Sequence, residues 1–193
     1  MINNYKLLTL LSVCILVTSC TAAGVALTGA KTVYDRHNIQ KSLDDKYTTF
    51  LAYRTIYSDT DKYQGTSVTV STYQNTVLIT GQVPDKTQQQ EITNIVKDIS
   101  GDRKVYNFTE ELAPSSALTR ASDSWISSKI KAKLIAVNDV DPSKIKVITE
   151  NGTVFLMGVV EREQALIAAD IAQGTNGVQG VVKVFSYLEI VRA

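Results

Sequence analysis

The chain contains two copies of one sequence pattern, and the second copy follows the first at a spacing of 77 residues. Valines and a glycine recur at that spacing as the pairs Val70 and Val147, Val77 and Val154, Gly81 and Gly158, and Val105 and Val182. Because each copy carries the same local preferences, the chain is constrained to fold as two similar units in tandem.

Each copy is predicted to contain a β-hairpin. In the segments 67–83 and 145–160, alternating strand residues lead to a polar turn, and a β-branched, apolar strand follows. The second turn is Asn151-Gly152, a strong signal because both turn positions must take a positive φ. The glycines that end the two hairpins are Gly81 and Gly158. We expect each glycine to permit a positive φ or a close approach between helix and strand.

Helical patterns flank each hairpin, and a further strand closes each copy. The predicted helices cover roughly 45–57, 85–100, 123–137 and 161–173, and the closing strands lie in 105–112 and 178–191. Ser122 and Asp123 are candidate N-caps for the third helix. The predicted order of elements in each copy is therefore helix–strand–strand–helix–strand. This order predicts an α+β unit in which a three-stranded mixed sheet packs on two helices.

The first 19 residues have the layout of a secretory signal peptide. Lys6 provides a basic start, an apolar stretch runs from Leu7 to Val17, and small residues precede Cys20. The stretch is shorter than the roughly 20 apolar residues that a membrane-spanning helix needs. It resembles a bacterial lipoprotein signal, which implies that Cys20 is acylated, with palmitate among the chains, and becomes the first mature residue. The alternative is an ordinary secretory signal in which Cys20 is incidental.

Charge and composition argue against several classes of function. The chain has 20 basic and 19 acidic residues, and loss of Lys6 with the signal leaves 19 of each, so no bulk attraction to nucleic acid is expected. Cys14 leaves with the signal, and His37 is the single histidine. We therefore expect no enzyme activity, no metal or other cofactor, and no small-molecule substrate.

The predicted helix at 123–137 has apolar residues on two sides. One face is expected to pack on the sheet and carries Ile126, Ile130, Leu134 and Val137. The opposite side carries Trp125, Ala132 and Ile135, flanked by Lys129, Lys131 and Lys133. No acidic residue occurs between Ser124 and Asn138. An exposed tryptophan among lysines suits a membrane interface, where the indole lies at headgroup level and lysines meet anionic lipid.

Two other interpretations of these helices stay open. Trp125 could anchor the helix against the first copy or against the linker, or it could bind a partner. The first helix, 45–57, is apolar nearly all round and rich in tyrosine, which is typical of burial or of a protein interface. We regard cover of the first copy's own sheet as the simpler explanation of that helix.

The two copies resemble tandem BON domains. The resemblance rests on T-V-L-I-T-G at 76–81 and T-V-F-L-M-G at 153–158, with Gly101 and Gly177 further on. It implies the boundaries 1–19 for the signal, 20–41 for a lipidated N-terminus and tether, 42–112 for the first domain, 113–119 for a linker and 120–193 for the second domain.

With a lipoprotein signal in front, the chain is similar to dual-BON outer-membrane lipoproteins. The resemblance implies a non-catalytic protein that is anchored in the outer membrane, faces the periplasm, binds anionic phospholipid through a helix of the second domain, supports envelope integrity and gathers at cell division sites. The alternative is a protein-interaction or chaperone-like scaffold for envelope assembly or division, with envelope protein partners bound through the first domain.

Overall fold

The computed structural model describes the backbone of residues 32–188 and the side chains of residues 40–188. The predicted signal, Cys20 and the side chain of His37 lie outside the described residues. Residues 39–193 form one compact unit that contains both repeats.

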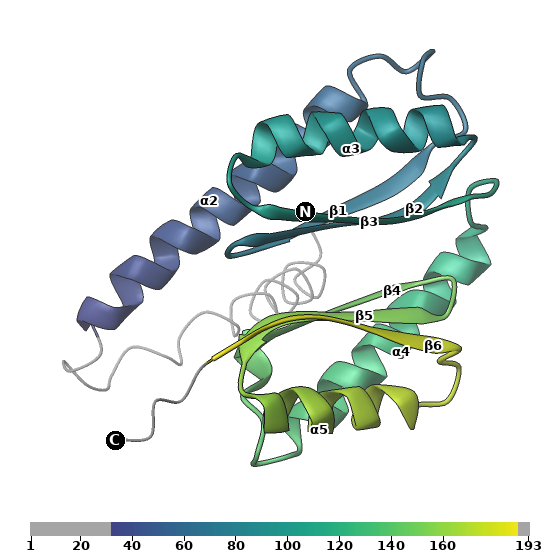
Figure 1. Cartoon of the computed structure of the whole chain (residues 1–193). Coiled ribbons are helices and arrows are strands. Elements are labelled where there is room, and N and C mark those ends of the chain that lie inside the picture. Colours follow the sequence, from purple (N-terminus) through teal and green to yellow (C-terminus); the bar gives the residue numbers. More distant parts are fainter. Residues whose placement is uncertain (1–31, 189–193) are drawn as a thin grey trace, which may run out of the picture. The chain divides into compact units, whose positions relative to one another are not determined.

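Each repeat folds into a three-stranded mixed sheet with two helices (Figure 1). The first repeat consists of α2 (Thr32–Ile56), β1 (Ser67–Tyr73), β2 (Thr76–Val83), α3 (Lys86–Ser100) and β3 (Lys104–Glu111). The second consists of α4 (Ala117–Ile135), the short 3-10 helix η1 (Pro142–Lys144), β4 (Ile145–Glu150), β5 (Thr153–Val160), α5 (Arg162–Gln173) and β6 (Gly180–Tyr187). The strand orders are β1-β2-β3 and β4-β5-β6. The predicted fold class and order of elements are confirmed.

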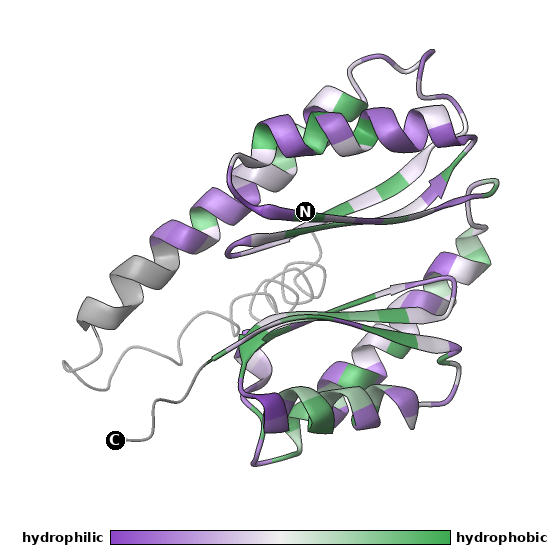
Figure 2. Cartoon of the chain, in the orientation of Figure 1, coloured by the Kyte–Doolittle hydropathy of each residue, from purple (hydrophilic) through white to green (hydrophobic). Residues whose placement is uncertain are grey.

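The middle strand of each sheet is antiparallel to its hairpin partner and parallel to the closing strand. Parallel strands need a crossover connection, which α3 and α5 provide. Both middle strands are buried over almost their whole length, because one face packs on helices and the other does not meet water. In Figure 2, hydrophobic colour follows the strands of the second sheet, whereas the helices carry both colours.

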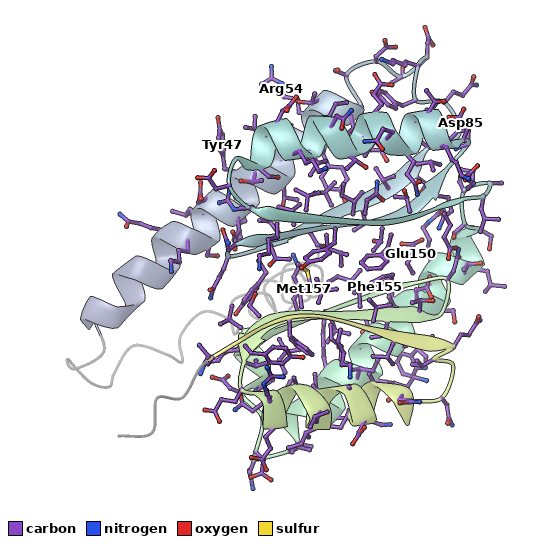
Figure 3. All side chains as sticks on the ribbon, viewed as in Figure 1. Tyr47, Arg54, Asp85, Glu150, Phe155 and Met157 are labelled. Atoms are coloured by element: carbon purple, nitrogen blue, oxygen red, sulfur yellow. The ribbon has the colours of Figure 1, made fainter. Side chains whose placement is uncertain are left out.

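Successive residues of β5 point to opposite faces, as strand geometry requires. Val154 and Leu156 join the core formed with α4 and α5. Phe155 and Met157 join a separate cluster with Leu78 of the first sheet, and Figure 3 shows both side chains between the two sheets. The ring centroids of Phe155 and Phe108 of β3 are 5.4 Å apart. The two domains therefore share a third, smaller core.

Two helices begin earlier than the sequence patterns indicate. The backbone of α2 is already helical at Thr32, inside the segment 20–41 that was expected to be a tether. Neither glycine nor proline occurs within this helix, so nothing in its sequence stops the helical turn.

The expected start of α4 at Ser122 or Asp123 is wrong. The helix begins at Ala117, and Ser116 is its N-cap, whose hydroxyl accepts a hydrogen bond from the backbone N–H of Thr119 at 3.1 Å. The predicted linker 113–119 is accordingly shorter. Asp123 lies inside the helix, where its side chain is buried and has a different partner.

The glycines that end the hairpins have a steric role. Gly81 has a φ of 114°, and a Cβ there would collide with the carbonyl oxygen of Ser67. A Cβ at Gly158 would collide in the same way with the carbonyl oxygen of Lys144, although the φ of Gly158 is ordinary. The close neighbour is thus the chain at the start of the adjacent strand, not a helix as the sequence pattern suggested.

Candidate functional site

The helix α4 has one buried face and one exposed face. Ile126, Ile130 and Leu134 are buried in the core of the second domain. Trp125 retains 66% of its surface and Ile135 retains 71%. Trp125 is therefore not an anchor between the domains, and that alternative interpretation is wrong.

The exposed face is longer than the sequence pattern indicated. Leu118, in the first turn of α4, is 81% exposed and lies seven residues before Trp125, which places it on the same side of the helix. The exposed residues at alternating spacings of three and four are Leu118, Ala121, Trp125, Ser128, Ala132 and Ile135, which we call the outer face of α4. Sequence reasoning missed Leu118 because the helix was expected to begin at Asp123.

Two of the flanking lysines are tied to the chain that follows α5. The ammonium group of Lys129 donates a hydrogen bond to the carbonyl oxygen of Asn176 at 2.7 Å. Lys133 donates to the hydroxyl of Thr175 at 2.9 Å and to the carbonyl oxygen of Gly174 at 3.3 Å. These acceptors lie at and just after the C-terminal end of α5, where the helix dipole favours positive charge. The two ammonium groups are thereby held beside the outer face.

Lys129 also lies near the tryptophan of the outer face. Its Nζ is 6.0 Å from the centroid of the Trp125 ring, which is close to the outer limit of a cation–π contact. Lys131 is exposed and lies on the other flank of the helix, next to Ile135. The six residues singled out from the sequence therefore lie on or beside one face, with cations along both edges.

A buried carboxylate positions α4 on the hairpin of the second domain. The Oδ2 atom of Asp123 accepts a hydrogen bond from the backbone N–H of Asn151, and Oδ1 accepts one from the N–H of Gly152, both at 2.9 Å. Asn151 and Gly152 both have a positive φ, as the Asn-Gly signal predicted. In that conformation the two N–H groups converge on one acceptor group.

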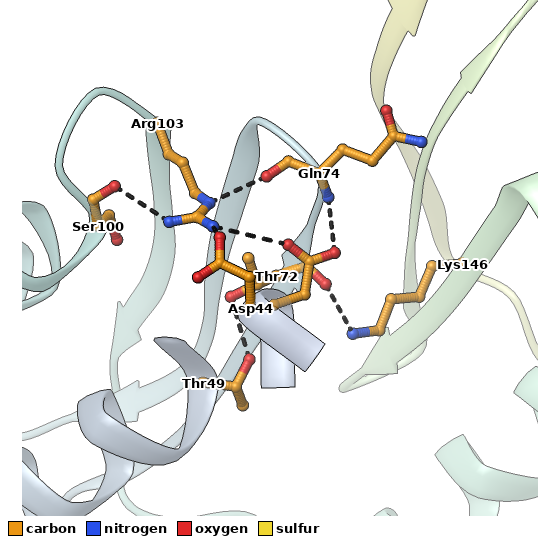
Figure 4. Close-up of polar contacts among 8 residues, drawn as sticks. Asp44, Thr49, Thr72, Gln74, Ser100, Arg103 and Lys146 are labelled. Atoms are coloured by element: carbon orange, nitrogen blue, oxygen red, sulfur yellow. Dashed lines mark hydrogen bonds and ion pairs between the residues drawn. The ribbon is translucent and has the colours of Figure 1, made fainter. Parts of the chain in front are cut away.

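The first domain uses a related contact at its own hairpin turn. The Oδ2 atom of Asp45 on α2 accepts a hydrogen bond from the backbone N–H of Gln74 at 2.8 Å. Arg103 donates to the carbonyl oxygen of Gln74 at 3.0 Å and pairs with Asp44, as Figure 4 shows. Burial raises the pKa of the Asp45 carboxyl above its ordinary value, although the hydrogen bond from Gln74 and the charge of Arg103 oppose that rise.

The first helix of the first domain also has an exposed apolar face. Leu43, Tyr47 and Phe50 are each more than half exposed, and the three lie on one side of α2. Tyr53 and Tyr57 instead stack on each other and bond to the backbone of β1. The hydroxyl of Tyr53 accepts a hydrogen bond from the N–H of Val70, and the hydroxyl of Tyr57 donates one to the carbonyl oxygen of Val68. The interpretation that the aromatic residues of this helix all cover the sheet holds for the pair Tyr53 and Tyr57 and fails for Tyr47 and Phe50.

Two features are absent from residues 32–188, the part of the chain that the structure describes. None of the helices in that part of the chain has both the length and the hydrophobicity that a bilayer span requires. The same residues contain no group of three or more His, Cys, Asp or Glu side chains with the spacing of a metal site.

Comparison with known proteins finds the same two domains. The family model of the BON domain matches residues 54–111 and 122–189. The chain is 35% identical over 186 residues to the outer membrane lipoprotein DolP of Haemophilus influenzae, a match that covers 95% of this chain and 96% of that protein.

Two further relatives match over shorter stretches. The 21 kDa hemolysin of Actinobacillus pleuropneumoniae is 35% identical over 122 residues, which is 63% of each chain. The osmotically-inducible protein Y of Escherichia coli is 33% identical over 127 residues, which is 64% of this chain and 63% of that protein.

Proposed function

The chain belongs to the BON domain family, and we propose that it is a non-catalytic, lipid-anchored protein of the outer membrane that contacts anionic phospholipid through the outer face of α4. The relative that matches almost the whole chain is named as an outer membrane lipoprotein, which supports an envelope location and an anchor at Cys20. On this proposal the protein faces the periplasm, supports envelope integrity and gathers at division sites.

One observation carries the membrane contact: Trp125 is two-thirds exposed on a helix face whose edges hold lysines and no acid. Trp125 is 66% exposed, and residues 124–138 contain no aspartate or glutamate. An indole is most stable at the level of the lipid headgroups, because its ring is apolar and its N–H needs a polar partner. Leu118 and Ile135 extend the apolar surface in both directions along the helix.

The contact between the outer face and the membrane is expected to be weak. A weak contact is enough when the acyl anchor already holds the protein at the membrane. A lysine near an anionic surface contributes about 1 kcal/mol, and salt screens that attraction. Lys129, Lys131 and Lys133 together therefore give a weak and reversible attachment. When an acyl chain on Cys20 already holds the protein, the second contact becomes intramolecular and needs little affinity of its own.

The test uses the mature chain with Cys20→Ser, which removes the acyl anchor and leaves only the outer face. Phosphatidylglycerol vesicles are expected to sediment the protein and to shift the emission of Trp125, its single tryptophan, to the blue. Phosphatidylcholine vesicles are expected to do neither, and about 0.5 M salt should release the protein because the lysine contacts are screened.

The variant Trp125→Glu should lose vesicle binding and keep its melting temperature. Leu166→Glu is the matched control, since Leu166 is also a large, exposed apolar residue but lies on α5. Equal loss of binding in both variants, or unchanged Trp125 emission with anionic vesicles, would contradict the proposed membrane contact.

A second function, as a protein-interaction or chaperone-like scaffold of the envelope, is favoured by the exposed face of α2. Leu43, Tyr47 and Phe50 would dock a protein partner through aromatic rings, which are common in interface cores. A photo-crosslinking residue at position 50 should then give discrete adducts in intact cells. The control carries the photo-crosslinking residue at position 97 in place of Lys97, which is exposed on α3. Equal labelling from both positions would exclude a specific partner-binding surface on α2.

A further inference from the structure

A pocket adjoins the outer face of α4 at its C-terminal end. The pocket has a volume of about 400 Å³ and lies between the last turns of α4, the short helix η1 and the strand β4, with Tyr73 of the first domain at one side. Leu134, Ile145 and Val147 form apolar walls, and Ile135 lies at the border with the outer face. The volume is within the range of roughly 300–1,000 Å³ that is usual for small-molecule sites.

Two ammonium groups belong to this pocket. Lys131 comes from α4 and Lys146 from β4, and the charge of Lys131 is near enough to lower the pKa of Lys146. Burial is the largest cause of that lowered pKa, and the charge of Asp45, which acts on Lys146 more strongly than that of Lys131, opposes it. A half-buried ammonium beside a second one is electrostatically unfavourable unless an anion joins them.

Lys146 is poorly satisfied by the protein. Its Nζ donates one hydrogen bond, to the carbonyl oxygen of Thr72 at 3.4 Å, which is at the long limit of such bonds (Figure 4). Among the described residues, none of the ion pairs within 4.0 Å includes Lys146. An ammonium group has three donors, so two remain for a ligand.

The acids near the pocket have partners elsewhere in the protein. The Oδ2 atom of Asp45 accepts from Gln74, whereas its buried Oδ1 has no hydrogen bond and lies 4.0 Å from Arg103. Asp141 accepts from the N–H of Ser143 at 3.1 Å and lies 3.5 Å from Lys144. Arg103 is shared between Asp44 and Asp45, so these contacts leave the two ammonium charges of Lys131 and Lys146 against one carboxylate charge. The pocket therefore keeps a net positive charge, which complements an anion.

We propose that this pocket takes one acyl chain of an anionic phospholipid, with the lipid phosphate between the ammonium groups of Lys131 and Lys146. The inference rests on the proposed membrane contact, because Ile135 borders both surfaces. The chain replaces water against Leu134, Ile145 and Val147, while the phosphate accepts charge-assisted hydrogen bonds from both lysines. β4 is an edge strand, so no further strand of the sheet closes this side.

The experiment uses the mature chain with Cys20→Ser and, as probe, dodecyl phosphate below its micellar concentration, measured by calorimetry. One site is expected per protein. Lys146→Gln should weaken binding at least about tenfold, because a hydrogen bond between charged groups is lost. Ser143→Phe should weaken it similarly by filling the rim, whereas Lys97→Gln, on an exposed lysine of α3, should leave it unchanged.

Three controls separate the outcomes. Inorganic phosphate should not bind measurably, and phosphate binding as tight as that of dodecyl phosphate would overturn the acyl-chain site. Thermal melts check that each variant is folded. Phosphatidylglycerol vesicles should still bind the Lys146→Gln and Ser143→Phe variants within a few-fold, because the outer face is intact in both.

If vesicles bind and dodecyl phosphate does not, or if both pocket variants bind it like the parent chain, the pocket proposal is wrong and the membrane contact stands. If dodecyl phosphate binds with the expected losses and vesicles do not, the pocket is supported as an anionic-amphiphile site and the contact through the outer face is wrong.

Discussion

Asp123, in the middle of α4, accepts a hydrogen bond from the backbone N–H of Gly152 at 2.9 Å, 29 residues further along the chain. Its other carboxylate oxygen accepts from Asn151. This one side chain joins the helix that carries the outer face to the turn of the hairpin beneath it. The rotation of α4 about its axis, and so the direction in which Trp125 points, depends on this contact together with the buried isoleucines.

Replacing Asp123 should destabilise the second domain. Asp123→Ala leaves two backbone N–H groups without an acceptor and is expected to cost about 3 kcal/mol in urea unfolding. Asp139→Ala removes an exposed acid nearby and should change stability by less than about 0.5 kcal/mol. A loss below about 1 kcal/mol for Asp123→Ala would mean that the turn does not need its acceptor.

Gly158 should tolerate no side chain. In Gly158→Ala the new methyl group meets the carbonyl oxygen of Lys144, so we expect a loss of about 1–3 kcal/mol in thermal or urea unfolding. Gly180→Ala is the matched control in the same sheet, because the nearest atoms to its new methyl lie 3.9 Å away on Thr153. That variant should be neutral or slightly stabilised. Similar losses at both positions would refute the steric explanation.

Substitutions on the buried and the exposed face of α4 should differ in their effect on stability. Ile130→Ala removes a fully buried side chain and should lower the free energy of unfolding by about 2–5 kcal/mol. Trp125→Ala should change it by less than about 0.5 kcal/mol, since the residue is exposed. Urea unfolding followed by far-UV circular dichroism measures both variants. A large loss with Trp125→Ala would identify that side chain as part of the core.

Glu150 should make the protein more stable in mild acid than at neutral pH. Burial raises the pKa of its carboxyl above the ordinary value of 4.5, although a hydrogen bond from Gln82 at 2.7 Å opposes the rise. The folded chain therefore holds this proton more tightly than the unfolded chain. The stabilisation is complete below pH 4.5 and is lost as the pH rises through the raised pKa.

The variant Glu150→Gln isolates that effect. It keeps an acceptor for Gln82 and has no carboxyl to titrate, so its free energy of unfolding relative to the parent should rise as the pH goes from about 4.5 upward to 7. Glu163→Gln, an exposed position on α5, is the control. A relative stability that falls over the same interval would contradict the direction of the pKa shift.

The second domain should fold by itself but should not stay monomeric. The fragment 113–193 keeps its own core of α4, α5 and the sheet, so cooperative unfolding is expected. Without Leu78 and Phe108 of the first domain, Phe155 and Met157 become exposed and should cause self-association in sedimentation velocity.

The substitution Met157→Lys should have different effects in the isolated fragment 113–193 and in the full chain. In the fragment it should reduce association with little loss of stability. In the full chain it buries a charge between the sheets and should cost on the order of 3 kcal/mol or more. Equal effects in both would show that the two sheets do not cover each other.

Much of the fold could be predicted because its signals are local. The repeat, the two hairpins, the Asn151-Gly152 turn and the helical patterns each depend on residues within a few positions of one another. The same period separated the buried face with Ile126 and Ile130 from the exposed face with Trp125. The start of α4 was missed because Ser116 and Asp123 are both acceptable N-caps, and only one of them caps the helix.

The sequence by itself determined that the chain is a duplicated α+β unit and that one helix in the second copy has an apolar stripe besides its core stripe, since periodicity and turn chemistry act between near neighbours. Only the tertiary structure decided what each side chain meets. Asp123 binds a turn, Lys129 and Lys133 bind the chain after α5, Lys146 lies beside the first domain, and Phe155 and Met157 pack between the sheets. The partners of Asp123, Lys129, Lys133 and Lys146 are 28 or more residues away in sequence, and a local pattern carries no information about atoms that the fold alone brings within reach.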